Sequence, residues 1–165
     1  MPDWDYQRRY YRRPAELAHD LRALVRERSG IKNLRKGALI DRAFQERLML
    51  TVTQVNGCRY CAYAHARMAL AAGVAQADVD ALAGGDLPAS PPAEIPALLY
   101  AQHWAETGAK PDPETRQHVL ETYGQAKTEA IELSMRLIRV GNLAGNTWDH
   151  LLYRVSSGRW GNRRH

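Results

Sequence analysis

The chain has 165 residues, of which 45% are hydrophobic and 25% charged, and its formal net charge is +5 at pH 7. This length is enough for one domain with a core of its own, over residues 1–165, without disulfide or metal staples. No apolar run approaches the roughly 18 residues that a bilayer span needs. The first residues carry no apolar segment behind their charges, so we expect no secretory signal and a cytoplasmic location.

Much of the positive charge lies near the two ends of the chain, at Arg8, Arg9, Arg12, Arg13, Arg159, Arg163 and Arg164. We interpret these ends as solubilising tails. Tyrosines alternate with the first arginines, a pattern that also occurs in proteins that contact nucleic acid or an anionic surface. Basic termini are more often solvated or packed on a partner subunit, so we expect neither nucleic acid nor a membrane as a partner.

Apolar residues at helical spacing predict helices along nearly the whole chain. Taken in order, the expected helices span residues 14–28, 39–55, 58–72, 76–83, 94–107, 113–123 and 128–155. Residues 31–37 are interpreted as a short basic connection, and Gly141 and Gly145 as places where the last helix bends or divides. No segment alternates with a period of two between hairpin turns, so the predicted fold class is all-α.

A weak internal similarity appears when the chain is shifted by 85 residues. Three positions agree: Leu48, Val55 and His65 align with Leu133, Val140 and His150. Such a pattern fits a duplicated helical pair in which only the first copy kept its cysteines.

The two cysteines, Cys58 and Cys61, lie three residues apart, and His65 follows four residues later. Side chains at this spacing share one face of a helix. The preceding Asn56-Gly57 pair favours the end of one helix, so Cys58 is expected to open the next. A thiol in the first turn of a helix meets unpaired backbone N–H groups and the positive end of the helix dipole, which lower its pKa.

Glu46 lies twelve residues before Cys58 on the preceding predicted helix. If the corner folds the two helices antiparallel, Glu46 comes near the level of His65. A carboxylate there would orient the imidazole, which would accept a proton from Cys61. Glu46 by itself is more simply a surface charge beside neighbouring arginines, but its spacing to the cysteine pair favours a proton relay.

These residues resemble a known pattern. Glu46, Cys58-x-Tyr60-Cys61 and His65 match E-x11-C-x-[HY]-C-x3-H, the motif of the alkylhydroperoxidase D branch of the carboxymuconolactone decarboxylase-like superfamily. The resemblance extends over about residues 38–150, with the helix of residues 14–28 before it.

The resemblance implies a helical bundle that assembles into trimers or hexamers and reduces hydroperoxides without a cofactor. It implies that Cys61 is the peroxidatic thiol, Cys58 the resolving thiol, and His65 with Glu46 the proton relay. An external dithiol, lipoyl-type or thioredoxin-like, would reopen the disulfide. Tyr60 stands where some members have histidine, and a phenol with a pKa near 10 is a poor base at neutral pH.

Two alternatives stay open at this point. Cys58, Cys61, His65 and Glu46 form a donor set that suits tetrahedral zinc. Structural zinc sites usually draw their ligands from separate elements, whereas three of these four share one helix. The second alternative is a helical oligomerisation or partner-binding protein in which the cysteines are small buried apolar residues. A thioredoxin fold is not expected, because no strands surround the cysteine pair.

Overall fold

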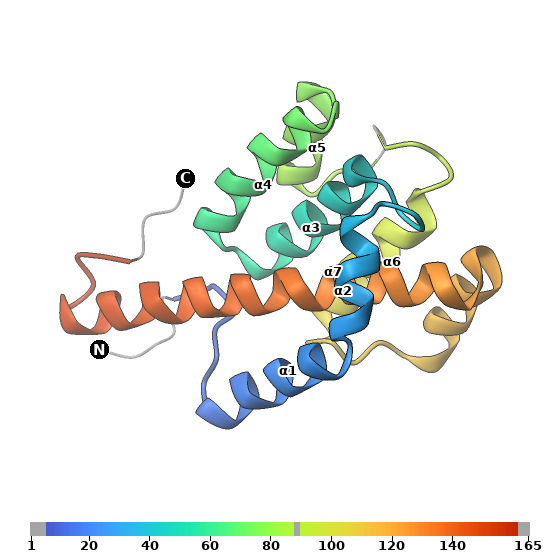
Figure 1. Ribbon diagram of the computed structural model, residues 1–165. Coiled ribbons are helices and arrows are strands. Elements are labelled where there is room, and N and C mark those ends of the chain that lie inside the picture. Colours follow the sequence, from blue (N-terminus) through green and yellow to red (C-terminus); the bar gives the residue numbers. More distant parts are fainter. Residues whose placement is uncertain (1–5, 88–89, 162–165) are drawn as a thin grey trace.

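The computed structural model describes residues 6–87 and 90–161, which form seven helices and no strand (Figure 1). The predicted all-α class is therefore confirmed. No helix in these ranges is both long and apolar enough to cross a bilayer. The helices are α1 (Pro14–Arg26), α2 (Arg28–Arg35), α3 (Arg42–Asn56), α4 (Arg59–Ala71), α5 (Gln76–Gly84), α6 (Ile95–Glu106) and α7 (Pro113–Val155).

The long α7 crosses the whole molecule and packs against α1, α2, α3, α4 and α6 (Figure 1). It breaks once, at Gly124, whose φ of 73° and ψ of 166° interrupt the helix. The two predicted helices of residues 113–123 and 128–155 meet at this glycine. The predicted bend at Gly141 and Gly145 is wrong, because the helix runs through both without interruption. The segment shifted by 85 residues is thus one uninterrupted helix and does not repeat the corner between α3 and α4.

The predicted connection over residues 31–37 is also wrong, because most of it belongs to α2. Gly30 reads as a helix stop in the sequence, yet it lies inside this helix. A Cβ atom at Gly30 would come within 2.9 Å of Leu133 Cδ2 on α7. The glycine therefore lets α2 lie directly against α7, and the burial of Leu34 stabilises that contact.

The N-terminal segment is not the solvated tail that its charge suggests. Tyr6 and Tyr11 are only 5% and 7% exposed, and the Tyr6 hydroxyl donates to the carbonyl oxygen of Asn146 at 2.7 Å. Arg8 forms an ion pair of 2.5 Å with Asp149 of α7. Because these contacts are buried, residues 6–11 are part of the folded structure. Of the other predicted tail positions, Arg159 is exposed, and Arg163 and Arg164 lie outside the described residues.

Helix α3 occupies the middle of the bundle and packs against α4, α5, α6 and α7. One apolar cluster surrounds it on the side of α6 and α7, with Leu48, Leu98, Trp104 and Ile131 among its members. A smaller cluster lies toward α4 and α5. Every residue from 44 to 53 is consequently buried, including charged ones. A carboxylate on this helix must therefore find its partners inside the protein.

Candidate active site

The cysteine pair lies at the corner between α3 and α4. Helix α3 ends at Gly57, whose φ of 75° is the left-handed conformation that glycine adopts without strain. Cys58 is the N-cap of α4, and its sulfur accepts the backbone N–H of Cys61 at 3.4 Å. Both cysteines are free thiols, and their sulfur atoms are 3.0 Å apart. The expected start of a helix at the first cysteine is thus present.

The two sulfurs differ in exposure and in acidity. Cys58 is 1% exposed, whereas Cys61 is only partly buried. A hydrogen bond from the Cys61 thiol lowers the pKa of Cys58 to about 6, and backbone N–H groups at the start of α4 assist against the opposing effect of burial. The same hydrogen bond and burial raise the pKa of Cys61. When the reduced pair has lost one proton, the negative charge therefore lies on the inner sulfur, and the remaining proton lies on the outer one.

Glu46 and His65 face each other across the α3–α4 contact. Oxygen Oε2 of Glu46 lies 2.6 Å from Nδ1 of His65, and the carboxylate is fully buried. Its other oxygen forms an ion pair of 2.6 Å with Arg42, one turn earlier on α3. The carboxylate holds the imidazole in one orientation and leaves its Nε2 atom directed away from this contact.

Tyr60 does not join Glu46 and His65. Its hydroxyl donates to Oδ1 of Asp149 on α7 at 2.8 Å. Arg59 donates to the same oxygen at 2.8 Å, and Arg8 pairs with the other oxygen. Asp149 is fully buried and holds the first turn of α4 against α7 through charge-assisted hydrogen bonds. Tyr60 thus takes part in positioning the cysteine pair.

Two glycines of α7 make room for the sulfurs. A Cβ atom at Gly145 would lie 3.1 Å from the Cys58 sulfur, and one at Gly141 would lie 3.8 Å from the Cys61 sulfur. Glycines four residues apart share one face of the helix. The backbone of α7 therefore forms the wall behind the cysteine pair, and the tighter contact is at Gly145.

Asparagines next to these glycines tie α7 to the corner. Asn142 and Asn146 are fully buried. The side chain of Asn142 exchanges hydrogen bonds with Thr53 and Asn56, at 3.0 and 3.1 Å, and a further one with Cys61 limits the rise in that thiol's pKa. Asn146 donates to the backbone oxygen of Asn56 at 2.8 Å. Buried polar groups that hydrogen-bond to one another in this way favour one geometry.

Sequence reasoning missed the residues of this α7 face, including Asp149. A signal was present in Gly141-Asn142-x-x-Gly145-Asn146-x-x-Asp149, where small and polar residues recur every four positions along one face of the helix. A regular polar face on a helix that must pack against the core indicates a buried polar contact.

The zinc alternative has no assembled ligand set. Within residues 6–87 and 90–161, no three side chains of His, Cys, Asp or Glu gather in a way that would hold a metal ion. In particular, the carboxylate of Glu46 is already occupied by Arg42 and His65. The arrangement of these side chains suits proton transfer and thiol–disulfide exchange better than metal coordination.

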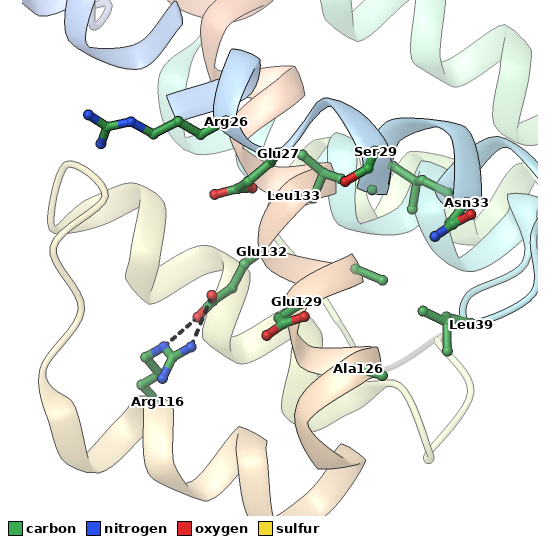
Figure 2. Close-up of a pocket in the computed structure, with 13 residues that line it drawn as sticks. Arg26, Glu27, Ser29, Asn33, Leu39, Arg116, Ala126, Glu129, Glu132 and Leu133 are labelled. Carbon is green, nitrogen blue, oxygen red and sulfur yellow. Dashed lines mark hydrogen bonds and ion pairs between the residues drawn. The ribbon is translucent and has the colours of Figure 1, made fainter. Parts of the chain in front are cut away.

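A cavity of about 600 Å³ lies on another part of the molecule, between α2, Arg116 and the middle of α7 (Figure 2). Its most buried charged group is Glu132, which accepts hydrogen bonds from Arg116 and from the Tyr100 hydroxyl at 2.7 and 2.8 Å. No cysteine or histidine is among the thirteen residues that line this cavity. Glu132 is thus paired within the protein, and the lining offers no thiol or imidazole that would compete with the corner.

Comparison with known proteins identifies a family for the chain but no individual relative. No curated protein and no solved structure gives a significant match to the chain. A model of the carboxymuconolactone decarboxylase family matches residues 21–107, slightly more than half of the chain. The matched region holds α3 and α4 with Glu46, both cysteines and His65, and it ends before α7. The chain belongs to the carboxymuconolactone decarboxylase family.

Proposed function

We propose that this protein is a thiol peroxidase, which reduces hydroperoxides while Cys58 and Cys61 cycle between dithiol and disulfide. Its family includes decarboxylases and peroxidases of the alkylhydroperoxidase D type. The observation that carries the proposal is the pair of free sulfurs 3.0 Å apart at the start of α4. Since a disulfide measures about 2.05 Å, the bridge can close with a movement of about 1 Å.

Cys61 attacks the peroxide because it is the sulfur that solvent reaches. Its proton passes to His65, whose ring Glu46 orients from α3. The Cys61 thiolate then attacks the distal oxygen of the peroxide and breaks the O–O bond. This step yields a sulfenic acid on Cys61 and an alkoxide.

His65 supplies the proton that the alkoxide needs. It lies four residues after Cys61 and therefore on the same face of α4. Glu46 fixes the ring through Nδ1, so Nε2 is the nitrogen that holds and passes the proton. The products of this step are an alcohol and the sulfenic acid, and His65 has passed on the proton that it took from Cys61.

Cys58 completes the oxidative half of the cycle. Its sulfur attacks the sulfenic acid of Cys61, a disulfide forms, and water leaves. Asp149 supports this step by holding the first turn of α4 through Arg59 and Tyr60. The chain contains only these two cysteines, so an external dithiol must return two electrons to the bridge.

The proposal is tested by intact-mass analysis of the reduced protein before and after one equivalent of hydroperoxide. We expect a loss of about 2 Da as the bridge forms. Cys58→Ser should instead gain about 16 Da as the sulfenic acid of Cys61 accumulates, and Cys61→Ser should show neither change. Peroxide consumption with dithiothreitol as the reductant should disappear in Cys61→Ser.

Other outcomes separate this function from the alternatives. Thiols that stay unmodified by peroxide in the folded protein would point to a structural role for the cysteines. Zinc that copurifies in stoichiometric amount and blocks the change in mass would point to a metal site. Sedimentation of the same samples tests the expected trimer or hexamer.

A further inference from the structure

The C-terminal part of α7 carries an exposed apolar strip. Its members alternate at spacings of four and three residues, which is the heptad spacing of helices that pack along each other. Trp148, Leu151 and Val155 are 57%, 50% and 68% exposed, and this end of α7 extends past α1 and α4 (Figure 1). We call the following six residues the α7 strip: Leu137, Gly141, Ala144, Trp148, Leu151 and Val155.

The other faces of this part of α7 are occupied within the chain. Asn142, Asn146 and Asp149 are buried against the rest of the protein. Leu133, one turn before the strip, is only 4% exposed and lies against α2 at Gly30. The strip therefore begins where α2 ceases to cover the helix. A hollow of about 410 Å³ lies on it, lined by three strip members and three of their neighbours. An exposed apolar patch of this kind indicates a surface that binds another molecule.

The α7 strip reaches the cysteine pair at Gly141. This glycine is exposed, and a Cβ atom there would lie 3.8 Å from the Cys61 sulfur. The side of Cys61 that faces α7 is therefore bordered by bare backbone at the surface of the chain. A side chain that lies over Gly141 from outside would border the same sulfur.

The α7 strip is complementary to itself when two copies run antiparallel. Its spacings of 4, 3, 4, 3 and 4 residues read the same from either end, so every member meets a member of the other copy. The matching apolar pairs are Trp148 with the partner's Ala144, Leu151 with the partner's Gly141, and Val155 with the partner's Leu137. The two largest side chains at the centre thus fill the space that the smallest residues leave, as close packing requires.

Charge also favours an antiparallel second copy as the occupant. No member of the α7 strip is charged, and the one charged residue in the lining of its hollow is Arg154. Parallel copies would bring the two Arg154 side chains together, and like charges repel. Antiparallel copies in this pairing separate them by about 24 Å along the helix axis.

We propose that two copies of this chain pair antiparallel through the α7 strip, so that Leu151 of the partner subunit lies over Gly141 beside the Cys61 sulfur. The contact is twofold symmetric, so each copy lends the same side chain to the other's site. It gives an even number of subunits, which selects the hexamer from the expected trimer and hexamer. The pairing does not depend on the proposed function. The role of Leu151 as an apolar wall for the organic part of a hydroperoxide rests on it.

Cross-linking tests the pairing without the native thiols. Cys58→Ser and Cys61→Ser remove them, and Gly141→Cys with Leu151→Cys place two new ones on each chain. Within one chain these lie about 15 Å apart along the helix, beyond a short bismaleimide, whereas the pairing makes them neighbours between chains. We expect covalent dimers from this variant. Leu151→Cys alone should give none, because its two copies also lie about 15 Å apart. Linking by Leu151→Cys alone, or no linking by the pair, would overturn the antiparallel contact.

Sedimentation compares two exposed leucines. Leu151→Glu places a carboxylate inside the contact and should halve the sedimenting mass. Leu99 on α6 is 53% exposed and lies outside the strip, so Leu99→Glu should keep the mass of the unchanged protein. An unchanged protein that sediments as a single chain or a trimer, or equal masses for the two variants, would reject the contact and leave the peroxidase proposal in place.

The role of Leu151 at the site is tested with two oxidants. We compare the rates at which cumene hydroperoxide and hydrogen peroxide form the disulfide, followed by mass. Leu151→Ala should lower the ratio of the first rate to the second about fivefold, because an apolar contact with the organic group is lost. Leu99→Ala should keep the ratio. An equal ratio in both variants would reject the wall, and failure of both oxidants with the unchanged protein would reject the proposed function, while cross-linking still decides on the pairing.

Discussion

The corner between α3 and α4 and the facing part of α7 contribute to the site in different ways. The corner holds the groups to which the proposed cycle assigns proton or electron transfer: Glu46, both cysteines and His65. Residues 141–149 of α7 hold no such group, and they supply space at two glycines, hydrogen bonds at two asparagines and a buried counter-ion at Asp149. The family match includes the first region and ends before the second. Reactive groups and the frame that aligns them can thus lie far apart in one chain.

Loss of the α7 counter-ion should give the largest effect. Asp149→Asn keeps the shape of the side chain and leaves Arg8 and Arg59 without a buried negative partner. We expect the free energy of unfolding to fall by about 3 kcal/mol, as measured by urea denaturation at a fixed protein concentration. As a control, Glu16→Gln removes an exposed ion pair with Arg13 and should cost less than about 0.5 kcal/mol. Equal losses of unfolding free energy in the two variants would show that the buried Asp149 stabilises the fold no more than an exposed ion pair does.

Removal of a reactive group from the corner should change the rate of disulfide formation more than the free energy of unfolding. Glu46→Gln leaves His65 without its carboxylate, so the ring is less well oriented for proton transfer. We expect the rate of disulfide formation with peroxide to fall by about 10- to 100-fold. Asp149→Asn, at equal folded concentration, should retain a larger share of this rate. The reverse order in stopped-flow measurements would contradict the division between the two regions.

Acidity should distinguish the two sulfurs. Cys58 has a lowered pKa in the folded protein, so between about pH 6 and 8.5 the folded chain binds fewer protons than the unfolded one. The free energy of unfolding of the reduced protein should therefore rise with pH across this window and lose this contribution as the pH falls through about 6. Above about pH 8.5 the free energy of unfolding should fall with pH, because the raised pKa of Cys61 keeps that thiol protonated in the folded chain while the unfolded chain ionises both thiols. In Cys58→Ser the free energy of unfolding should not rise with pH over this window. A rise that persists in this variant would show that another group causes it.

The two glycines of α7 should give the smallest effects and opposite signs. Gly141→Ala places a methyl group 3.8 Å from the Cys61 sulfur, an ordinary contact, so helix propensity should stabilise the protein by about 0.5–1 kcal/mol. Gly145→Ala places one 3.1 Å from the buried Cys58 sulfur, which has to move. We expect that variant to gain no stability and to form its disulfide more slowly. Thermal unfolding and intact-mass time courses measure both, and identical behaviour of the two variants would argue against a tight wall at Gly145.

Much of the fold was predictable because its signals are local. Asp112 and Pro113 marked the start of α7, and Asn56-Gly57 marked the corner that opens α4 at Cys58. The errors at α2 and at Gly141 and Gly145 share one cause. A glycine in a helical pattern indicates a break, although each of these glycines makes room for a neighbour from another part of the chain.

The sequence by itself determined the all-α class, the positions of most helices and the spacing of the cysteines, His65 and Glu46. These depend on periodicity, caps and distances along one or two helices, which neighbouring residues specify. Only the tertiary structure decided that the Tyr60 hydroxyl binds Asp149, that the N-terminal segment packs beside the site, and that Cys58 is the buried sulfur, against Gly145. Each of these depends on contacts between segments separated by 50 or more positions, where burial and pairing of charges set the outcome and local pattern carries little information.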